Sequence, residues 1–551
     1  MPRHAPGTRL ATHEVSNQPG EFAGRNLFAT DMALRDAALR EGGCWLEMPL
    51  SALGEAAGSE HVLELGEVAN RCPPELVSFD RYGRRLDEVR FHPAYYELMT
   101  LAMEHRIHDI AWAQPRPGGH VAHAALLTLF TQAEAGTMCP MSMTYSAVPA
   151  LRRTPEIGDR WIGKLVGGRY DPVLRPLREK NGVTIGMAMT EKQGGSDVRA
   201  NTTQAAPLEG AGNRAYRLRG HKWFCSAPMS DGFLTLAYAP GGLSCFLVPR
   251  IAPDGERNGI QLMRLKDKLG NRSNASAEIE YHDAYAELIG DEGQGVKAIV
   301  EMVHHTRLGT IAGTLGIMRM ALAQAVNHAA GRRVFQKTLI DQPAMQAVLA
   351  DLALEYEAAA LLVMRVARAF DGADEDERAF GRLAVAVAKY WLTKGCANFV
   401  YECMECLGGA GYVEESPLPR LFRESPLNAI WEGSGNVIAL DILRTLAREP
   451  AALDAFAAEL ELARGADQRL DEAADQLVAR LRKAPPSQSE ARFHADRMAL
   501  VLQAALMVRH APADVSGPFV LSRIGRQAGR SFGSFAAPAD FRPILDRQAA
   551  T

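Results

Sequence analysis

Long hydrophobic runs are missing from this sequence, and none approaches the roughly 18 unbroken apolar residues that a membrane-spanning helix needs. The first residues, Met1-Pro2-Arg3-His4, lead into no apolar core of the signal-peptide type. No G-x-G-x-x-G motif follows a strand-like segment, and no G-x-x-x-x-G-K-[ST] motif occurs, which excludes the dinucleotide-binding Rossmann and P-loop classes. We therefore expect a cytoplasmic protein with no membrane span.

Cysteine is also scarce: the 551 residues contain eight, scattered and mostly in apolar surroundings. Scattered thiols suit a reducing compartment. Cys403-Met404-Glu405-Cys406 is a lone C-x-x-C in a helical pattern, with no second pair and no suitably spaced histidine, so packing is favoured over a zinc or redox role. The pair His304-His305 likewise fits an ordinary helix better than a pair of ligands, and we expect no metal site.

Neither positive nor negative charge dominates the chain as a whole, because the formal net charge is only -4. A uniformly basic nucleic-acid binder is thereby disfavoured, although a local basic patch remains allowed. The apolar, charged and aromatic fractions are ordinary for a globular protein, and the length is sufficient for three or four domains.

The hydrophobic periodicity changes twice along the chain. Residues 1–182 favour helices, residues 183–290 favour short strands, and residues 291–446 return to long helical patterns over Val296–Ala329, Ala344–Phe370 and Glu377–Leu407. Breaks at 331–342 and 372–376 suit antiparallel bundle helices. A linker-like segment at 484–489 indicates that residues 447–551 form an appended helical unit. The chain is thus predicted to be α+β and mostly α.

One window carries the clearest chemical signal: Ile430-Trp431-Glu432-Gly433-Ser434-Gly435-Asn436. The glycines keep the backbone thin beside a bulky ligand, and Ser434 or Asn436 could cap the helix that follows. Glu432 could abstract a proton from a substrate lying against a flat cofactor. Taken alone, however, the window also fits a helix-capping turn that happens to contain a glutamate.

Four further motifs are weak one by one. Paired glycines beside hydroxyl side chains could cradle a pyrophosphate, an aromatic pair could stack on a planar cofactor, and an arginine could bind phosphate. A plain turn or core packing explains each equally well. The motifs are Met187 to Asp197, Gly220 to Ser226, Gly331 to Gln336, and Leu407 to Tyr412.

Together, the five motifs resemble the acyl-CoA dehydrogenase superfamily of flavoproteins in order and spacing. The family carries Thr-Glu-x-x-x-Gly-Ser-Asp, Lys-x-Trp-Ile-Thr, Arg-x-x-Phe, Gly-Gly-x-Gly-Tyr and Tyr-Glu-Gly-Thr, and the resemblance covers about residues 60–446. It implies an N-terminal helical domain, a middle β-barrel and a C-terminal four-helix bundle, with the appended helical domain as an addition. It also implies FAD between barrel and bundle, acyl-CoA as a possible substrate, and a homotetramer in which a neighbouring subunit completes each cofactor site.

The resemblance also implies roles for individual residues. Glu432 falls at the position of the base that removes the substrate α-proton, while Thr306-Arg307 stands where some branches keep Glu-Arg, so the alternative base is absent. Arg332, Phe335 and the Gly408-Gly409 turn are expected to reach the FAD of an adjacent subunit. The remaining cofactor-binding residues implied are Met187, Met189, Thr190, Gly195, Ser196, Trp223, Phe224, Ser226, Trp431, Gly433, Ser434 and Asn436.

The departures from the family pattern are informative. Phe224 holds the position of the stacking aromatic with Trp223 before it, Lys192-Gln193 replaces a proline-containing turn, and Glu405 replaces a glutamine before the Gly-Gly turn, a change that puts that cross-subunit contact in doubt. The variants Thr-Glu-Lys-Gln-Gly-Gly-Ser-Asp, Lys-Trp-Phe-x-Ser and Ile-Trp-Glu-Gly-Ser-Gly-Asn resemble the AidB-like branch. That resemblance implies a role in the adaptive response to DNA alkylation and binding of double-stranded DNA.

A basic tail follows the region of resemblance. Between Gln476 and Ser534, nine basic residues face three acidic ones. A solvated basic face is the plain alternative to phosphate contact, and no base-reading module is present, so DNA binding should be sequence-tolerant and salt-sensitive. The candidate DNA-binding residues are Arg444, Arg480, Arg482, Lys483, Arg492, Arg497, Arg509, Arg523, Arg526 and Arg530.

Two other functions stay open on sequence grounds. The chain could be a metabolic acyl-CoA dehydrogenase that uses Glu432 as its base and carries the tail as decoration. Alternatively, the tail could lie on a membrane surface, since segments such as Met498 to Met507 are apolar, although burial in a core suits that segment better.

Overall fold

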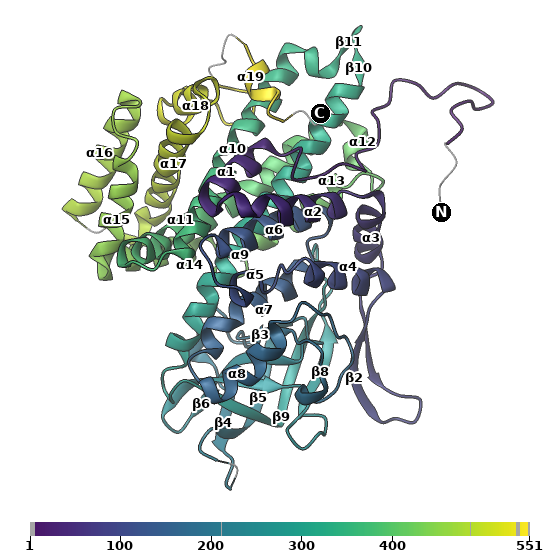
Figure 1. Ribbon diagram of the computed structural model, residues 1–551, viewed down its shortest axis with the longest axis vertical. Helices are drawn as coiled ribbons and strands as arrows, with labels where there is room; N and C mark the ends of the chain where they lie inside the picture. The colour runs from purple at the N-terminus through teal and green to yellow at the C-terminus, as the bar shows by residue number, and fades with distance from the viewer. Residues whose placement is uncertain (1–5, 211, 485, 536–539, 549–551) are drawn as a thin grey trace.

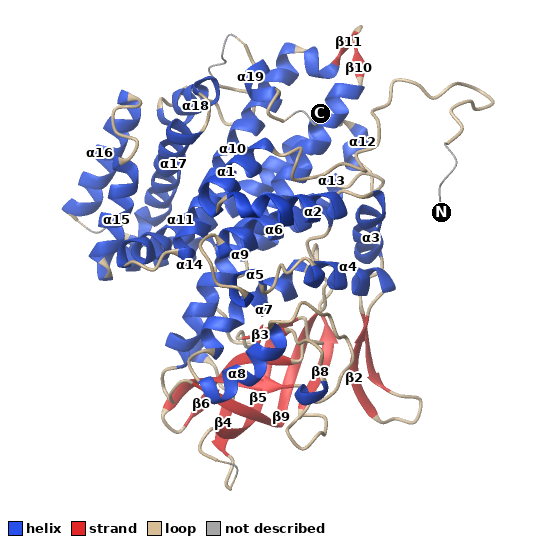
Figure 2. Cartoon of the chain, in the orientation of Figure 1, coloured by secondary structure: helices blue, strands red, loops and turns tan. Residues whose placement is uncertain are grey.

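The computed structural model describes residues 6–210, 212–484, 486–535 and 540–548. Figures 1 and 2 show a β-barrel at one end of the molecule, long helices through the centre, and the C-terminal helices packed beside them. The expected α+β, mostly helical fold is confirmed. No helix in the described part of the chain is long and apolar enough to cross a membrane.

The N-terminal region is helical but contains a β-hairpin that the sequence patterns did not predict. Strands β1 (Glu75–Phe79) and β2 (Arg85–Arg90) pair antiparallel and reach the barrel, where Asp87 Oδ1 accepts a hydrogen bond from Leu262 N (3.0 Å). The helices are α1 (Met32–Gly42), α2 (Glu47–Ala57), α3 (Glu60–Arg71), α4 (Pro93–Glu104), α5 (Ile110–Ala113), α6 (Gly119–Ala133), α7 (Met138–Leu151) and α8 (Pro155–Leu165).

The strand-rich region forms a closed sheet. Its strands are β3 (Ile185–Ala188), β4 (Gln204–Pro207), β5 (Ala215–Ser226), β6 (Gly232–Ala239), β7 (Gly242–Pro249), β8 (Ile260–Leu265) and β9 (Ser276–Ile289). The pairing order β3-β6-β4-β5-β9-β7 is closed by an additional β6–β7 pairing, and β8 pairs with β9. Closure removes the exposed edges of an open sheet, which confirms the expected barrel.

Long antiparallel helices follow the barrel, as the periodicity predicted. They are α9 (Gly295–Gly331), α10 (Pro343–Asp371) and α11 (Glu375–Cys406), with the small hairpin β10 (Arg333–Val334) and β11 (Lys337–Thr338) between the first two. Asp374 caps α11, since its side chain accepts a hydrogen bond from Glu377 N, and Pro343 opens α10 at a position that lacks an intrahelical N–H partner. The shorter helices are α12 (Gly409–Tyr412), α13 (Leu418–Glu424) and α14 (Gly435–Arg448).

The C-terminal helices share one hydrophobic core with the bundle. They are α15 (Pro450–Glu461), α16 (Gln468–Lys483), α17 (Ala491–His510), α18 (Ala513–Phe519) and α19 (Arg542–Leu545). Buried ion pairs cross the junction, for example Arg365–Glu459 at 2.7 Å. The apolar residues of α17 between Met498 and Met507 pack into this core, whereas Phe493 near the start of the helix is exposed. The linker-like segment at 484–489 joins α16 to α17, and its Pro485 lies outside the described residues.

Close helix packing fixes the position of α9. A Cβ at Gly309 would lie 2.1 Å from Ser142 Oγ on α7, and one at Gly316 would lie 2.5 Å from the carbonyl oxygen of Thr128 on α6. Thr128 Oγ1 also donates a hydrogen bond to the carbonyl of Ala312 (3.0 Å). The glycines therefore let α9 approach both neighbours closely, and this places its residue Thr306 opposite the loop that carries Glu432.

Candidate active site

Glu432 lies in a tight loop between a short 3-10 turn at Leu427–Ala429 and helix α14. Its φ of 56° is in the left-handed region, which is unusual for a residue with a side chain, and Gly433 follows with φ of 105°. A Cβ at Gly433 would meet Ile438 Cδ1 at 2.8 Å, so the thin backbone expected there is required. Backbone strain of this kind persists only where the surroundings hold it.

Helix α9 provides the partner of the Glu432 carboxylate. Thr306 Oγ1 donates a hydrogen bond to Glu432 Oε2 at 2.6 Å, and Arg307 Nε donates to the Glu432 carbonyl at 3.3 Å. Burial raises the pKa of Glu432, whereas the Thr306 hydrogen bond and the charges of Arg307 and Lys389 act to lower it. Thr306, at the alternative base position, is thus a direct hydrogen-bond partner of Glu432, the expected base.

Neither expected helix cap forms at the start of α14. Ser434 occupies the N-cap position with extended backbone angles, but its side chain makes no capping hydrogen bond. Asn436 Oδ1 instead accepts a hydrogen bond from Arg492 Nε of α17 at 2.7 Å. The prediction that Ser434 or Asn436 caps this helix through its side chain is wrong, because Asn436 is drawn to a C-terminal arginine.

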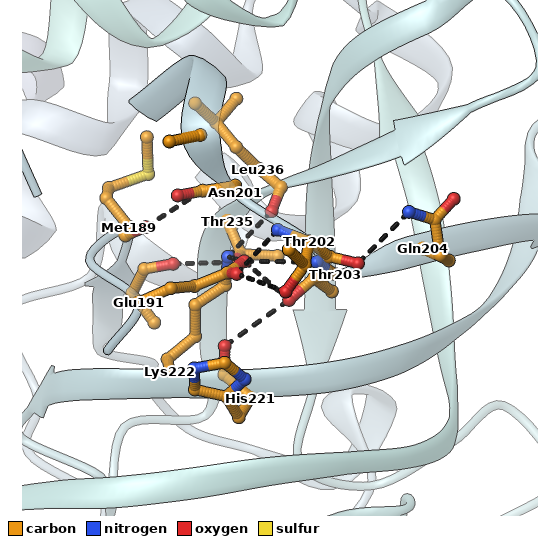
Figure 3. A network of polar contacts seen from close by, with 12 residues as sticks. Met189, Glu191, Asn201, Thr202, Thr203, Gln204, His221, Lys222, Thr235 and Leu236 are labelled. Atoms are coloured by element: carbon orange, nitrogen blue, oxygen red, sulfur yellow. Dashed lines mark hydrogen bonds and ion pairs between the residues drawn. The ribbon is translucent and has the colours of Figure 1, made fainter. Parts of the chain in front are cut away.

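The Thr190–Ser196 loop is held to the barrel by a buried ion pair, which Figure 3 shows. Glu191 Oε1 accepts from Lys222 Nζ (2.8 Å) and from Thr203 Oγ1 (2.6 Å), and Glu191 Oε2 accepts from the backbone N–H of Thr202 (2.7 Å). Burial opposes ionisation of Glu191, but Lys222 and the surrounding donors outweigh it and lower its pKa to about 2. Sequence reasoning placed Glu191 and Lys222 within motifs but did not identify this role.

The loop and strand β5 also contact each other directly. Trp223 N donates to the carbonyl of Thr190 at 2.8 Å, and a Cβ at Gly195 would lie 2.6 Å from Thr190 Oγ1. The Lys266 ammonium lies 3.2 Å from the centroid of the Trp223 ring and 4.8 Å from that of Phe224, which is 46 % exposed. One cation therefore contacts both aromatic rings, and the exposed part of Phe224 stays available to a ligand.

A small cavity of about 50 Å³ lies next to the residues that precede Glu432, between α6, α7, α9 and Trp431. Within the described chain, the Trp431 indole N–H has no hydrogen-bond partner, although it is buried. The lining is largely apolar, with a few hydroxyl, amide and carboxyl groups, and includes Leu127, Met138, Cys139, Thr310, Glu424 and Asn428.

Some predicted cofactor residues do not join this site within one protomer. Arg332 and Phe335 lie at the β10–β11 hairpin, at the opposite end of the molecule from the barrel in Figure 1. Phe335 is 93 % exposed, and Arg332 Nη1 donates to the carbonyl of Asn17 at 2.8 Å. Gly409 also has open space beside it. An exposed phenylalanine of this kind is available to another molecule but not to the site of its own chain.

The ten candidate DNA-binding residues fall into two groups. The first is paired with carboxylates: Arg509 with Glu459 (2.6 Å), Arg523 with Asp351 (2.6 Å), Arg482 with Asp454 (2.8 Å), Arg480 with Glu490 (3.4 Å) and Arg444 with Asp441 (3.4 Å). The second group forms no ion pair with any described residue and consists of Lys483, Arg492, Arg497, Arg526 and Arg530.

Three family models match the chain in succession. The model described as the adaptive response protein AidB N-terminal domain covers residues 17–172, the acyl-CoA dehydrogenase middle domain covers 186–284, and the acyl-CoA dehydrogenase C-terminal domain covers 293–447. The AidB protein of Escherichia coli is 46 % identical over 503 residues, which span 91 % of this chain and 92 % of that protein. The chain belongs to the AidB-like branch of the acyl-CoA dehydrogenase superfamily.

Solved structures agree with this assignment. Caenorhabditis elegans ACDH-11 in complex with C11-CoA superposes with a TM-score of 0.83 at 29 % identity, covering 95 % of this chain and 93 % of that one. An acyl-CoA dehydrogenase from Bacillus anthracis complexed with FAD superposes with a TM-score of 0.62 at 18 % identity, covering 83 % and 86 %, which shows the shared fold alone.

As a member of this superfamily the AidB-like chain is an FAD-dependent oxidoreductase. The residues present fit that cofactor. Gly195 leaves no room for a side chain against Thr190, Phe224 presents an exposed ring, and the buried Trp431 N–H lacks a partner among the described residues. Thin backbone, an aromatic face and an unused donor are what a planar, phosphate-bearing ligand requires.

Proposed function

We propose that this chain is a flavoprotein of the DNA alkylation response that binds double-stranded DNA without strong sequence preference and keeps acyl-CoA dehydrogenase chemistry at Glu432. The relation to AidB supports the first part, since the matching model describes an adaptive response protein. The buried Thr306–Glu432 contact supports the second.

The protein's contribution to the chemistry is a positioned base. FAD, when bound, supplies the acceptor for a hydride from the substrate β-carbon. Glu432 takes the α-proton as a general base, and the electron pair of the broken Cα–H bond becomes the second bond between the α- and β-carbons as the hydride leaves the β-carbon. Thr306 donates to one carboxylate oxygen, so Oε1 is the atom left to receive the proton. The residues predicted to bind the cofactor from Met187 to Ser226 and from Trp431 to Asn436 stay assigned to that role in this proposal.

The main support for DNA binding is a pair of arginines, Arg497 and Arg526, that form no ion pair with a carboxylate of the described residues. Burial lowers the pKa of Arg497 on α17, and the positive charge of the nearby Arg526 lowers it further. Neither forms an ion pair with a described residue. Two neighbouring positive charges repel each other unless an anion binds near them, and a backbone phosphate is an anion that arginine binds well.

The ion pairs of the C-terminal helices favour a smaller set of DNA-binding residues than the ten candidates. Arg509 and Arg523 are held by buried carboxylates, so we assign them to the junction between bundle and C-terminal helices rather than to phosphate. We propose Arg497 and Arg526 as the centre of the surface, with Lys483, Arg492 and Arg530 as further contacts. Arg480 and Arg482 carry exposed ion pairs that a phosphate could displace at small cost. Arg444 is itself exposed, but its partner Asp441 is buried and is also held by Arg307 and Arg382.

Charge reversal tests this surface. We expect Arg497→Glu with Arg526→Glu to lower duplex affinity and to reduce the slope of log affinity against log salt concentration by about 2, because each phosphate contact contributes about 0.9. The measurement is fluorescence anisotropy of a labelled duplex over a salt series. FAD content, read from absorbance, should not change.

The matched control is Arg81→Glu with Arg178→Glu, which makes the same change in net charge at two exposed sites outside the C-terminal region. The control should keep most of the affinity. If both double variants lose the same affinity and salt slope, binding reflects net charge rather than a surface, and the proposal fails.

A metabolic acyl-CoA dehydrogenase is the second candidate, and the contact of Glu432 with Thr306 favours it as much as the first. C. elegans ACDH-11 has been solved in complex with C11-CoA. The two candidates differ in the wild-type protein. Rapid flavin bleaching by an acyl-CoA with no measurable duplex affinity would support the metabolic function, and duplex binding with slow bleaching would support the DNA function.

We further propose that the chain acts as a homotetramer in the cytoplasm. The exposed Phe335 at the β10–β11 hairpin supports assembly, since its ring could reach a cofactor on an adjacent copy. All eight cysteines are free thiols, which suits a reducing compartment.

A further inference from the structure

Lys389 on α11 is a buried lysine with an unusual partner. Its side chain is 1 % exposed, its ammonium donates a hydrogen bond to the carbonyl oxygen of Gly433, and it forms no ion pair with any carboxylate in the described chain. Burying a charged group without a counter-ion costs free energy unless an opposite charge or polar groups nearby stabilise it. Glu432 precedes Gly433 in the chain, so the Lys389 ammonium lies beside the loop that carries the proposed base.

Thr306 has two acceptors within reach of a single hydroxyl hydrogen. Its Oγ1 lies 2.6 Å from Glu432 Oε2 and 3.0 Å from the carbonyl oxygen of Val303. The hydrogen can point to the Glu432 carboxylate. When Glu432 carries a proton on Oε1, its Oε2 becomes a weaker acceptor, and the Thr306 hydrogen can turn to the Val303 carbonyl. The Thr306 hydroxyl therefore favours the ionised carboxylate over the carboxylic acid.

We propose that Thr306 and Lys389 are positioning residues that together hold the Glu432 loop in its left-handed conformation and keep the Glu432 carboxylate ionised. Thr306 does so through a charge-assisted hydrogen bond to the carboxylate, and Lys389 through its charge and its bond to Gly433. Neither touches substrate or cofactor in this assignment. The inference rests on the proposed role of Glu432 as the base.

Other charged and titratable groups also surround Glu432. Arg307 binds the Glu432 carbonyl but is largely committed to Asp441 of α14 (2.7 Å), which Arg382 of α11 also contacts (3.0 Å). The groups on the packed elements are His304 and Arg307 of α9, Arg382 and Lys389 of α11, Asp441 of α14, and Cys139 of α7. Three side chains of the described residues donate hydrogen bonds to Glu432 or Gly433, namely Thr306, Arg307 and Lys389. Of these, Thr306 and Lys389 have no other carboxylate as a partner, whereas Arg307 pairs with Asp441.

The sign of the effect follows from the charges. A donor and a cation both favour the carboxylate over the carboxylic acid, so removing either should raise the pKa of Glu432. Burial, followed by the charge of Arg307, lowers the pKa of Lys389 to about 7, while Glu432 acts to raise it. Lys389 is therefore charged mainly below about pH 7.

Infrared difference spectroscopy of the FAD-loaded protein across a pH titration tests the proposal. The band of a protonated carboxyl that disappears in Glu432→Gln identifies Glu432, and its midpoint is measured without any substrate. We expect Thr306→Val and Lys389→Met each to raise the midpoint by about half a pH unit or more. Thr306→Ser keeps the hydroxyl and should titrate like the wild type.

Two variants of Lys389 separate its charge from its hydrogen bond. Lys389→Gln keeps a donor for Gly433 without the charge, so it should raise the midpoint as Lys389→Met does but disturb the loop less. If both fail to fold, the loss shows that Lys389 is needed structurally, and unchanged titration in Thr306→Val against Thr306→Ser would then overturn the proposal. Unchanged midpoints in folded variants of both residues overturn it directly.

The outcome can be distinguished from failure of the dehydrogenase function. A wild type whose flavin no acyl-CoA bleaches would end that function, yet the infrared midpoint of Glu432 could still shift in Thr306→Val. Conversely, normal bleaching with unshifted midpoints would keep the function and reject the two positioning residues.

Discussion

At the scale of single residues, the loop of Glu432, the proposed base, is held by Thr306 of α9 and Lys389 of α11. Glu432 stood out because it lies between Trp431 and Gly433 in a motif with family precedent. Its partners are spread over two helices, and nothing local links them to it. Lys389 did leave a signal, since it is the only charge within the apolar helical run 383–392, and such an isolated charge indicates a buried partner.

Replacing the base itself is the clearest test at this scale. We expect Glu432→Gln to abolish bleaching of the flavin by a short-chain acyl-CoA under anaerobic conditions, with a loss of at least about 100-fold, as is typical for removal of a general base. Stopped-flow absorbance measures it. The variant should retain FAD and its oligomeric state, and a bleaching rate equal to that of the wild type would show that Glu432 is not the base.

At the scale of elements, the order of helix, strand and helix regions was predictable because each has its own hydrophobic period. The β1–β2 hairpin was not, since it is short, half-exposed and stabilised by contacts with the distant strand β8. The conformation of the Thr190–Ser196 loop was likewise not predictable from its own residues. Its motif was visible, but its geometry depends on Lys222, about 30 residues later, and on the threonines at the start of β4.

The buried pair that fixes this loop can be tested directly. We expect Lys222→Met to destabilise the protein by about 3–5 kcal/mol and to reduce FAD retention, because Glu191 would be left buried without its counter-charge. The double variant Glu191→Gln with Lys222→Met should recover much of that loss. Denaturant midpoints followed by FAD absorbance measure both, and equal midpoints for the single variant and wild type would contradict this role.

The same pair predicts an acid limit. The pKa of Glu191 is about 2 in the folded protein, below the ordinary value of 4.5, so the pair stabilises the fold above that ordinary value. The stabilisation should be lost as the pH falls from about 4.5 towards 2, since the unfolded chain binds the proton first. Thermal midpoints of the wild type should therefore fall more steeply over this window than those of Glu191→Gln with Lys222→Met.

At the scale of the whole molecule, the C-terminal helices are more than an addition. The tail was predictable from its charge, but a separate core was not found, because Arg365 and Arg523 join the C-terminal helices to α10 of the bundle through Glu459 and Asp351. Arg509 of α17 pairs with the same Glu459 of α15. Part of the positive charge counted in the sequence is therefore neutralised by ion pairs inside the protein. The Arg492–Asn436 bond also brings these helices to the active-site loop.

Assembly makes a prediction at the same scale. We expect Phe335→Asp to lower FAD retention and to shift the molecular mass in solution below that of a tetramer, because the exposed ring would be replaced by a charge where a neighbouring copy is proposed to bind. Light scattering coupled to size exclusion measures this. Phe493→Asp, an exposed phenylalanine on α17, is the matched control, and identical behaviour of both variants would contradict the assignment.

The central claim is that one chain carries a flavin-side base and a separate DNA-binding surface. The most direct measurement is duplex binding and acyl-CoA bleaching on the same preparations of Glu432→Gln and of Arg497→Glu with Arg526→Glu. The account predicts a crossed result: the first variant binds duplex DNA normally but does not bleach, and the second bleaches normally but loses salt-dependent binding. Loss of both properties in either variant, or loss of neither, would contradict it.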